Sequence, residues 1–203
     1  MKNIVKIFVA AVMMLACTNA FAQSVAAGYV QSSRTVYANA PANGFFAGVG
    51  YCAEAGSGFE LRPGLYYEFL TSSSSSSVGG GLIAGASKTT EHYLNVPFHL
   101  SYGYSFAPNF KMSAFAGPMA SFGIASKTHA TGSVLGLGGS NDLDNYADAD
   151  ISRFDIMVGG GVRANVGKIN VLVGYDLGLL DRDKSDDVVL KRNRFTVGLE
   201  YNF

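Results

Sequence analysis

The chain has 203 residues and carries 15 basic and 15 acidic side chains, which gives a formal net charge of zero at pH 7. This balance gives no indication of a nucleic-acid partner, since proteins that bind nucleic acid concentrate Lys and Arg. The sequence is rich in Gly, Ser, Tyr and Phe and includes 25 glycines, a composition that favours β-structure over helix.

The first 22 residues have the organisation of an export signal. Two lysines precede an apolar run over residues 7–16, and small side chains at Ala20 and Ala22 define a cleavage site before Gln23. The run is too short to cross a bilayer as a helix, which needs about 20 apolar residues. We therefore predict that residues 1–22 are a signal peptide.

Removal of this segment from the 203-residue chain leaves 181 residues, 23–203, a length that suits one domain. The mature chain has 13 basic and 15 acidic side chains and no run apolar enough for a transmembrane helix. Its single cysteine, Cys52, excludes an internal disulfide. Cys17 offers the alternative of a lipoprotein, but Met14 and Leu15 fit the usual lipidation motif poorly.

Eight segments of the mature chain have the residue pattern of β-strands. They cover residues 25–33, 44–55, 58–70, 91–105, 109–125, 151–166, 168–180 and 192–203. Long connections span 34–43, 71–90, 126–150 and 181–191, and they alternate with short ones near Ser57, Pro108 and Gly167. Outer-membrane β-barrels have an even number of strands, joined alternately by short periplasmic turns and longer extracellular loops. The pattern therefore predicts such a barrel, with both termini on the periplasmic side.

Apolar and polar side chains alternate along these candidate strands. In the segments 58–70, 91–105, 151–166 and 168–180, every charged residue falls on the more polar face. The last segment ends the chain at an aromatic residue and places one apolar row on a single face. That row is Phe195, Val197, Leu199, Tyr201 and Phe203. Such alternation is typical of the closing strand of an outer-membrane barrel, with one row facing lipid and one facing the lumen.

Alternation alone does not say which face points into the barrel. A secreted soluble barrel of lipocalin type, with apolar residues inside, is the alternative. The export signal, the aromatic terminus and the alternating connections favour lipid around the apolar face. Aromatic residues near both ends of that face fit two interfacial belts, although ordinary strand propensity explains some of them. They are Tyr51, Phe59, Tyr102, Phe110, Tyr201 and Phe203 near the turns, and Phe45, Phe69, Phe122, Phe154 and Phe195 near the loops.

Several short motifs resemble a known family. They are the segments 93–97 (Tyr-Leu-Asn-Val-Pro), 154–162 and 175–179, together with the terminal strand. The mature chain resembles the small porin-like outer-membrane β-barrel proteins of Gram-negative bacteria, of the eight-stranded type. The resemblance implies an all-β fold, an eight-stranded antiparallel up-and-down transmembrane β-barrel. It implies no catalytic, cofactor-binding or metal-binding residues, and we predict no cofactor.

Strand parity places a near-balanced set of charges in the lumen. The set comprises Glu54, Glu60, Glu68, Asp155, Asp176, Glu200, Arg62, Lys111, Arg153, Arg163 and Arg194, with His99 beside them. A barrel of about eight strands is just wide enough for side chains to fill it. Because unpaired buried charges are costly, we expect these groups to pair and to plug the lumen. The alternative is a narrow ion path lined by the same residues.

Two other features suggest chemistry only weakly. His99 and Ser101 share one face of a strand, and a Ser–His–acid arrangement could serve a lipid hydrolase, but this pair points into the lumen. The acidic segment 141–150 could hold Ca²⁺, yet it lacks the glycine spacing of an EF-hand loop. The serine tract Ser72–Ser77 is predicted to be an exposed, flexible loop.

These observations predict a structural or surface-interaction protein of the outer membrane that acts through its extracellular loops and is not an enzyme. A narrow porin-like conduit for ions or small solutes is the alternative. The expected partners are outer-membrane lipid and lipopolysaccharide, and the barrel assembly machinery, which would recognise the C-terminal strand. We expect a monomer without a nucleic-acid partner.

Overall fold

The structure is a computed structural model that describes residues 23–34, 41–78, 83–134, 137–148, 151–183 and 190–203. The predicted signal peptide and most of the connections 34–43 and 181–191 lie outside these residues. The described residues contain no helix that is long and apolar enough to cross a membrane.

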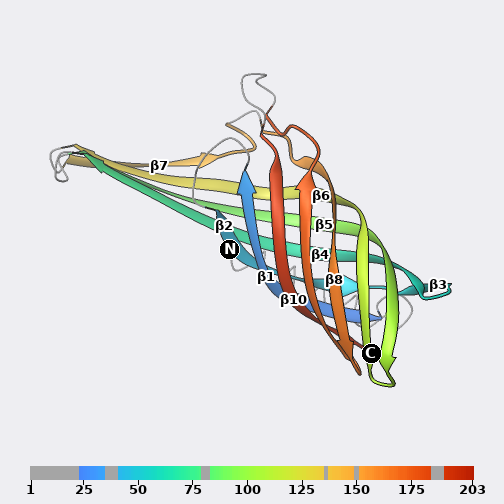
Figure 1. Ribbon diagram of the computed structural model, residues 1–203. Coiled ribbons are helices and arrows are strands. Elements are labelled where there is room, and N and C mark those ends of the chain that lie inside the picture. Colours follow the sequence, from blue (N-terminus) through green and yellow to red (C-terminus); the bar gives the residue numbers. More distant parts are fainter. Residues whose placement is uncertain (1–22, 35–40, 79–82, 135–136, 149–150, 184–189) are drawn as a thin grey trace.

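Eight antiparallel strands pair in a closed ring (Figure 1). They are β1 (Ser24–Arg34), β2 (Ala42–Gly50), β4 (Phe59–Val78), β5 (Ile83–Ala107), β6 (Phe110–Val134), β8 (Phe154–Val166), β9 (Ile169–Gly178) and β10 (Arg192–Asn202). Each strand pairs with its neighbours along the chain, β10 pairs with β1, and β2 pairs with β4. The ring confirms the predicted eight-stranded up-and-down barrel.

The ends of the chain and the short turns lie where the sequence pattern predicts them. Ser24 pairs with Asn202, and Phe203 donates a backbone hydrogen bond to Gln23 over 3.0 Å, so the first and last strands meet at one end. The predicted strand 44–55 is interrupted at residues 51–52 and continues as β3 (Ala53–Gly56). The β3–β4 turn that follows uses positive φ at Gly56, Ser57 and Gly58.

The two faces of the ring differ as predicted. The outward row exposes large apolar side chains, including Val158, Leu199 and Phe203, whereas inward residues such as Glu68 and Asp155 are buried. Rings pack together near both ends of the outer surface, as in the Phe45–Phe69 pair at 5.4 Å and the Phe59–Tyr102 pair at 4.8 Å between centroids. An apolar exterior bounded by aromatic residues is the surface that a bilayer requires.

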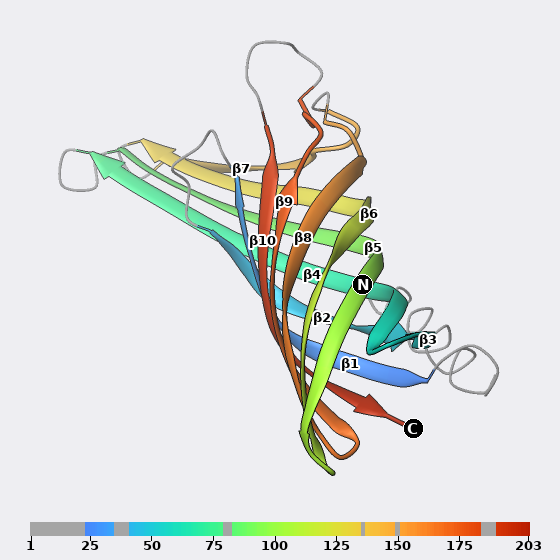
Figure 2. The same ribbon diagram turned by 45° about the vertical axis from the view of Figure 1, so that its right-hand side comes forward.

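Three strands continue well beyond the ring, and this feature corrects the sequence analysis. β4, β5 and β6 extend together, and β7 (Leu137–Asp144) pairs with the end of β6 (Figure 2). We call the resulting four-stranded element, residues 72–78, 83–89, 128–134 and 137–144, the projecting sheet. The tract Ser72–Ser77, predicted to be a flexible loop, is strand, because each of its residues pairs with a residue of β5.

Candidate functional site

The lumen of the barrel is the candidate site. The most buried cluster of charged side chains lies between the centre of the lumen and its extracellular end. The Glu68 carboxylate, 0 % exposed, lies 2.8 Å from Arg192 Nη1 and 2.5 Å from Arg194 Nε. Arg194 Nη1 also lies 2.8 Å from Asp176 Oδ2, and Asn95 donates to Glu68 over 3.0 Å. These residues come from β4, β5, β9 and β10, so the cluster ties together strands from opposite sides of the ring.

A second cluster lies at the extracellular end of the lumen, above Glu68. Arg182, from the chain after β9, is 2 % exposed and donates to Tyr93 Oη over 3.0 Å. Tyr93 donates in turn to Glu91 over 2.9 Å, and Glu91 lies 2.6 Å from Arg34. The Arg192 guanidinium stacks on the Tyr93 ring at 3.9 Å, so that the two clusters are in contact. Cations stacked on aromatic rings are stabilised by the ring quadrupole.

Aromatic rings fill the middle of the lumen where glycines on the facing strands make room. A Cβ at Gly198 would lie 2.6 Å from the Phe46 ring, and one at Gly161 would lie 2.7 Å from the Phe115 ring. Both phenylalanines are buried, at 3 % and 7 % exposure. The cavity beside them has a volume of only about 60 Å³.

The periplasmic end of the lumen holds a third cluster around a larger cavity. Arg62 bridges Glu60, at 2.8 Å, and Glu200, at 3.1 Å, while Arg163 Nε lies 3.1 Å from the second oxygen of Glu200. Lys111 pairs with the other oxygen of Glu60. The adjoining cavity has a volume of about 530 Å³, and we call it the periplasmic vestibule.

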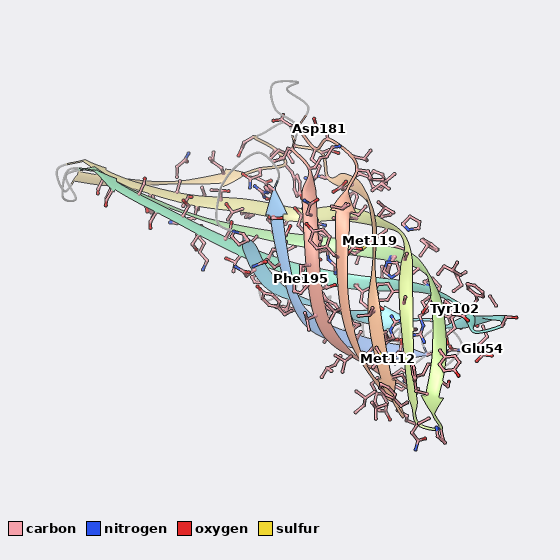
Figure 3. All side chains as sticks on the ribbon, viewed as in Figure 1. Glu54, Tyr102, Met112, Met119, Asp181 and Phe195 are labelled. Carbon is pink, nitrogen blue, oxygen red and sulfur yellow. The ribbon has the colours of Figure 1, made fainter. Side chains whose placement is uncertain are left out.

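Strand parity correctly predicted most of the charged residues that line the lumen. Nine of the eleven predicted charged residues line the lumen, but Glu54 is exposed at the vestibule rim, beyond the break between β2 and β3 (Figure 3). Arg153 precedes β8, is exposed, and stacks on Tyr146 at 4.6 Å instead of entering the barrel. Four paired residues were not predicted from the sequence, namely Arg34, Glu91, Arg182 and Arg192.

The structure does not form the arrangement that a hydrolase would need at His99 and Ser101. Among the described residues, neither His99 Nε2 nor Ser101 Oγ has a hydrogen-bond partner. The His99 ring packs on Phe115 at 4.9 Å between centroids. A nucleophile must be within hydrogen-bond reach of its base, and this pair makes no such contact.

The acidic segment 141–150 is mostly sheet and turn. Its first residues belong to β7, and Asp142 pairs with His129 across to β6. Asp144 and Asp148 accept backbone hydrogen bonds of 3.0 Å and 2.8 Å within the turn that follows. In the described part of the chain, which omits residues 149–150, no group of three possible metal-binding side chains occurs.

Comparison with known proteins agrees with this architecture. Residues 16–183 match the family model "Outer membrane protein beta-barrel domain". Solved structures with a similar fold include Ail, the attachment invasion locus protein of Yersinia pestis, at 17% identity and a TM-score of 0.40, covering 89% of this chain and 97% of that one. Neisserial surface protein A is 10% identical with a TM-score of 0.46, covering 89% of this chain and 96% of that one. A search of curated proteins finds no match.

Proposed function

The chain belongs to the outer membrane protein beta-barrel domain family, and we propose that within it this protein is a structural and surface-interaction protein rather than a solute conduit. It is an outer-membrane β-barrel, whose exposed apolar row lies in the bilayer. In this proposal it is not an enzyme. It is a monomer that contacts lipid and lipopolysaccharide, and the assembly machinery recognises its C-terminal strand.

The filling of the lumen is the observation that carries the proposal. Between the Glu68 cluster and the periplasmic cluster the barrel is occupied by Phe46, Phe115 and Met119, beside a cavity of about 60 Å³. An ion crossing this narrow layer would lose most of its water. The neighbouring guanidinium and carboxylate groups could not replace that water, because they already pair with one another. The lumen is thus better suited to fixing the strands than to conducting solutes.

The projecting sheet supports the surface-interaction part of the proposal. The β2–β4 pairing ends at Asn43 and Thr71, so the following edge of β4 has no strand partner within the described residues. That edge, Ser72–Ser77, contains no charged residue and no proline, two features that commonly protect edge strands. An exposed, unprotected edge is suited to pairing with an extended segment of a partner protein.

Conductance across planar lipid bilayers tests the closed lumen. We expect the purified barrel to give no stepwise current, in the wild type and in Glu200→Ala. Stable steps in the wild type, with an ion selectivity that Glu200→Ala changes, would refute the closed lumen and favour the narrow conduit.

Attachment of intact cells to mammalian cell monolayers tests the projecting sheet. Residues 74–87 and 130–141 would each be replaced by a two-residue Asn-Gly turn, which shortens both hairpins and leaves the ring intact. We expect attachment to fall to the level of cells without the protein, while the shortened barrel keeps its heat-modifiable mobility in gels. Undiminished attachment by the shortened variant would contradict the proposed role of the sheet.

A further inference from the structure

The periplasmic vestibule has the features of a binding site that the proposed function does not use. Its volume of about 530 Å³ is within the range of small-molecule pockets, and most of the residues that line it are polar. The layer of Phe46 and Phe115 separates it from the extracellular half of the lumen. A ligand would therefore have to enter from the periplasm.

Two buried donors in the vestibule wall have no acceptor. Asn170 is 1 % exposed and Arg163 is 7 % exposed, and both line the cavity. Asn165 donates to Asn170 Oδ1 over 2.8 Å, which leaves the Asn170 amide nitrogen as the free group. Neither Asn170 Nδ2 nor Arg163 Nη1 has a hydrogen-bond partner among the described residues. Buried polar groups are normally paired, and each unmade bond costs free energy.

The charges around these donors favour an anion. Three cations line the vestibule, Arg62, Lys111 and Arg163, and within ion-pair distance they share two carboxylates, Glu60 and Glu200. The inner wall therefore carries one more positive than negative charge. Glu54 also lines the cavity, but it is an exposed residue at the rim, where water screens it.

We propose that the vestibule binds a small periplasmic molecule through an oxyanion, either a carboxylate or a phosphate, which accepts hydrogen bonds from Arg163 and Asn170. An oxyanion supplies acceptors for both free donors and neutralises the excess positive charge. Arg163 Nε lies 3.1 Å from Glu200, within ion-pair distance, but it too makes no hydrogen bond among the described residues. Binding at this end is independent of the projecting sheet, and its failure would leave the proposed function untouched.

Cys52 provides a native reporter, since it lines the same cavity and is free. In the folded barrel with Cys17 absent or replaced by serine, the thiol would be reacted with two methanethiosulfonates that differ in charge, one carrying a sulfonate and one a trimethylammonium group. We expect the anionic reagent to react about tenfold faster, the low end of what a charged cleft adds to encounter with a counter-ion. Inorganic phosphate or acetate should slow that reaction in a saturable way, and the more effective of the two identifies the class of oxyanion.

Two variants and a control make the test specific. Arg163→Gln and Asn170→Ala should each abolish saturable protection by phosphate and acetate, while Ser113→Ala, in the same wall, should retain it. Heat-modifiable mobility establishes that each variant is folded, and Asn170→Ala keeps every charge if Arg163→Gln fails to fold. Equal rates for the two reagents, or no saturable protection in the wild type, would overturn the proposal. Protection that survives in both folded variants would also overturn it.

Discussion

Neutralising Glu68 provides a direct measure of what the central ionic cluster contributes to stability. Glu68→Gln preserves the size of the side chain but removes the charge that faces Arg192 and Arg194. Arg194 keeps Asp176 at 2.8 Å, whereas Arg192, 1 % exposed, has no other carboxylate within ion-pair distance among the described residues. Removing one partner of a buried pair costs about 3–5 kcal/mol. Because glutamine still offers one acceptor oxygen, we expect a loss of about 3 kcal/mol, the low end of this range.

Urea unfolding in lipid vesicles, followed by far-ultraviolet circular dichroism because the chain has no tryptophan, measures this loss. Asp142→Asn is the control, since Asp142 pairs with His129 on the projecting sheet with its side chain 84 % exposed. An exposed pair contributes about 0–1 kcal/mol, so the control should scarcely change the unfolding free energy.

A double variant shows whether Glu68→Gln lowers stability by leaving a charge unpaired or only by weakening packing. Arg192→Met added to Glu68→Gln removes the cation that the first change leaves alone, and it should restore most of the lost stability. Replacing a buried pair by apolar residues is often neutral or stabilising. If Glu68→Gln cost less than about 1 kcal/mol, or if the double variant were less stable than the single one, the cluster would not be held by this pairing.

Three further predictions concern the barrel wall. Val158→Arg, which places a cation on the outward row, should cost roughly 2–4 kcal/mol of unfolding free energy in vesicles, whereas Val158→Leu should change little. Gly161→Ala should cost at least about 1–3 kcal/mol, because its Cβ would clash with the Val173 carbonyl oxygen and would also lie 2.7 Å from the Phe115 ring. Gly132→Ala, with open space around it, is the neutral control. Phe203→Asp should lower the yield of heat-modifiable barrel in cells, since we propose that the assembly machinery recognises the closing strand. An unchanged yield would argue against that role.

Alternation along the strands, together with the export signal, the aromatic terminus and the alternating connection lengths, predicted the ring and most of the lumen. Arg194 and Glu200 were placed inside because they share parity on β10, and both are buried there. Arg192 has the same parity and was missed only because it lies at the first residue of its strand. Parity fails where a strand is irregular, as at Glu54, where the β3–β4 pairing is shifted between residues 54 and 56.

Arg182 could not have been found from any periodic pattern. It lies outside the strands, and its burial depends on the path that residues 179–182 take after β9. That path is fixed by contacts distant in sequence, including hydrogen bonds from the Arg182 side chain to the Ser152 carbonyl and to Tyr93. Sequence alone indicated a polar loop, whereas the fold buries one residue of that loop at the extracellular end of the barrel.

The projecting sheet is a second feature that the sequence pattern did not predict, and here the feature is backbone structure rather than a single side chain. Serine has little preference for strands, and six in succession ordinarily indicate a flexible segment. Here the serines continue β4 along β5, and β5 pairs with β6 from the first residue of β5 onward. The strand pairing beyond the ring therefore continues the register that is set in the barrel wall. The sheet should therefore depend on the β5–β6 hairpin more than on the serine side chains. Its outer edge is exposed because β2 stops pairing with β4 at Thr71. The end of the β2–β4 pairing thus leaves free the edge of β4 that we propose as the interaction surface.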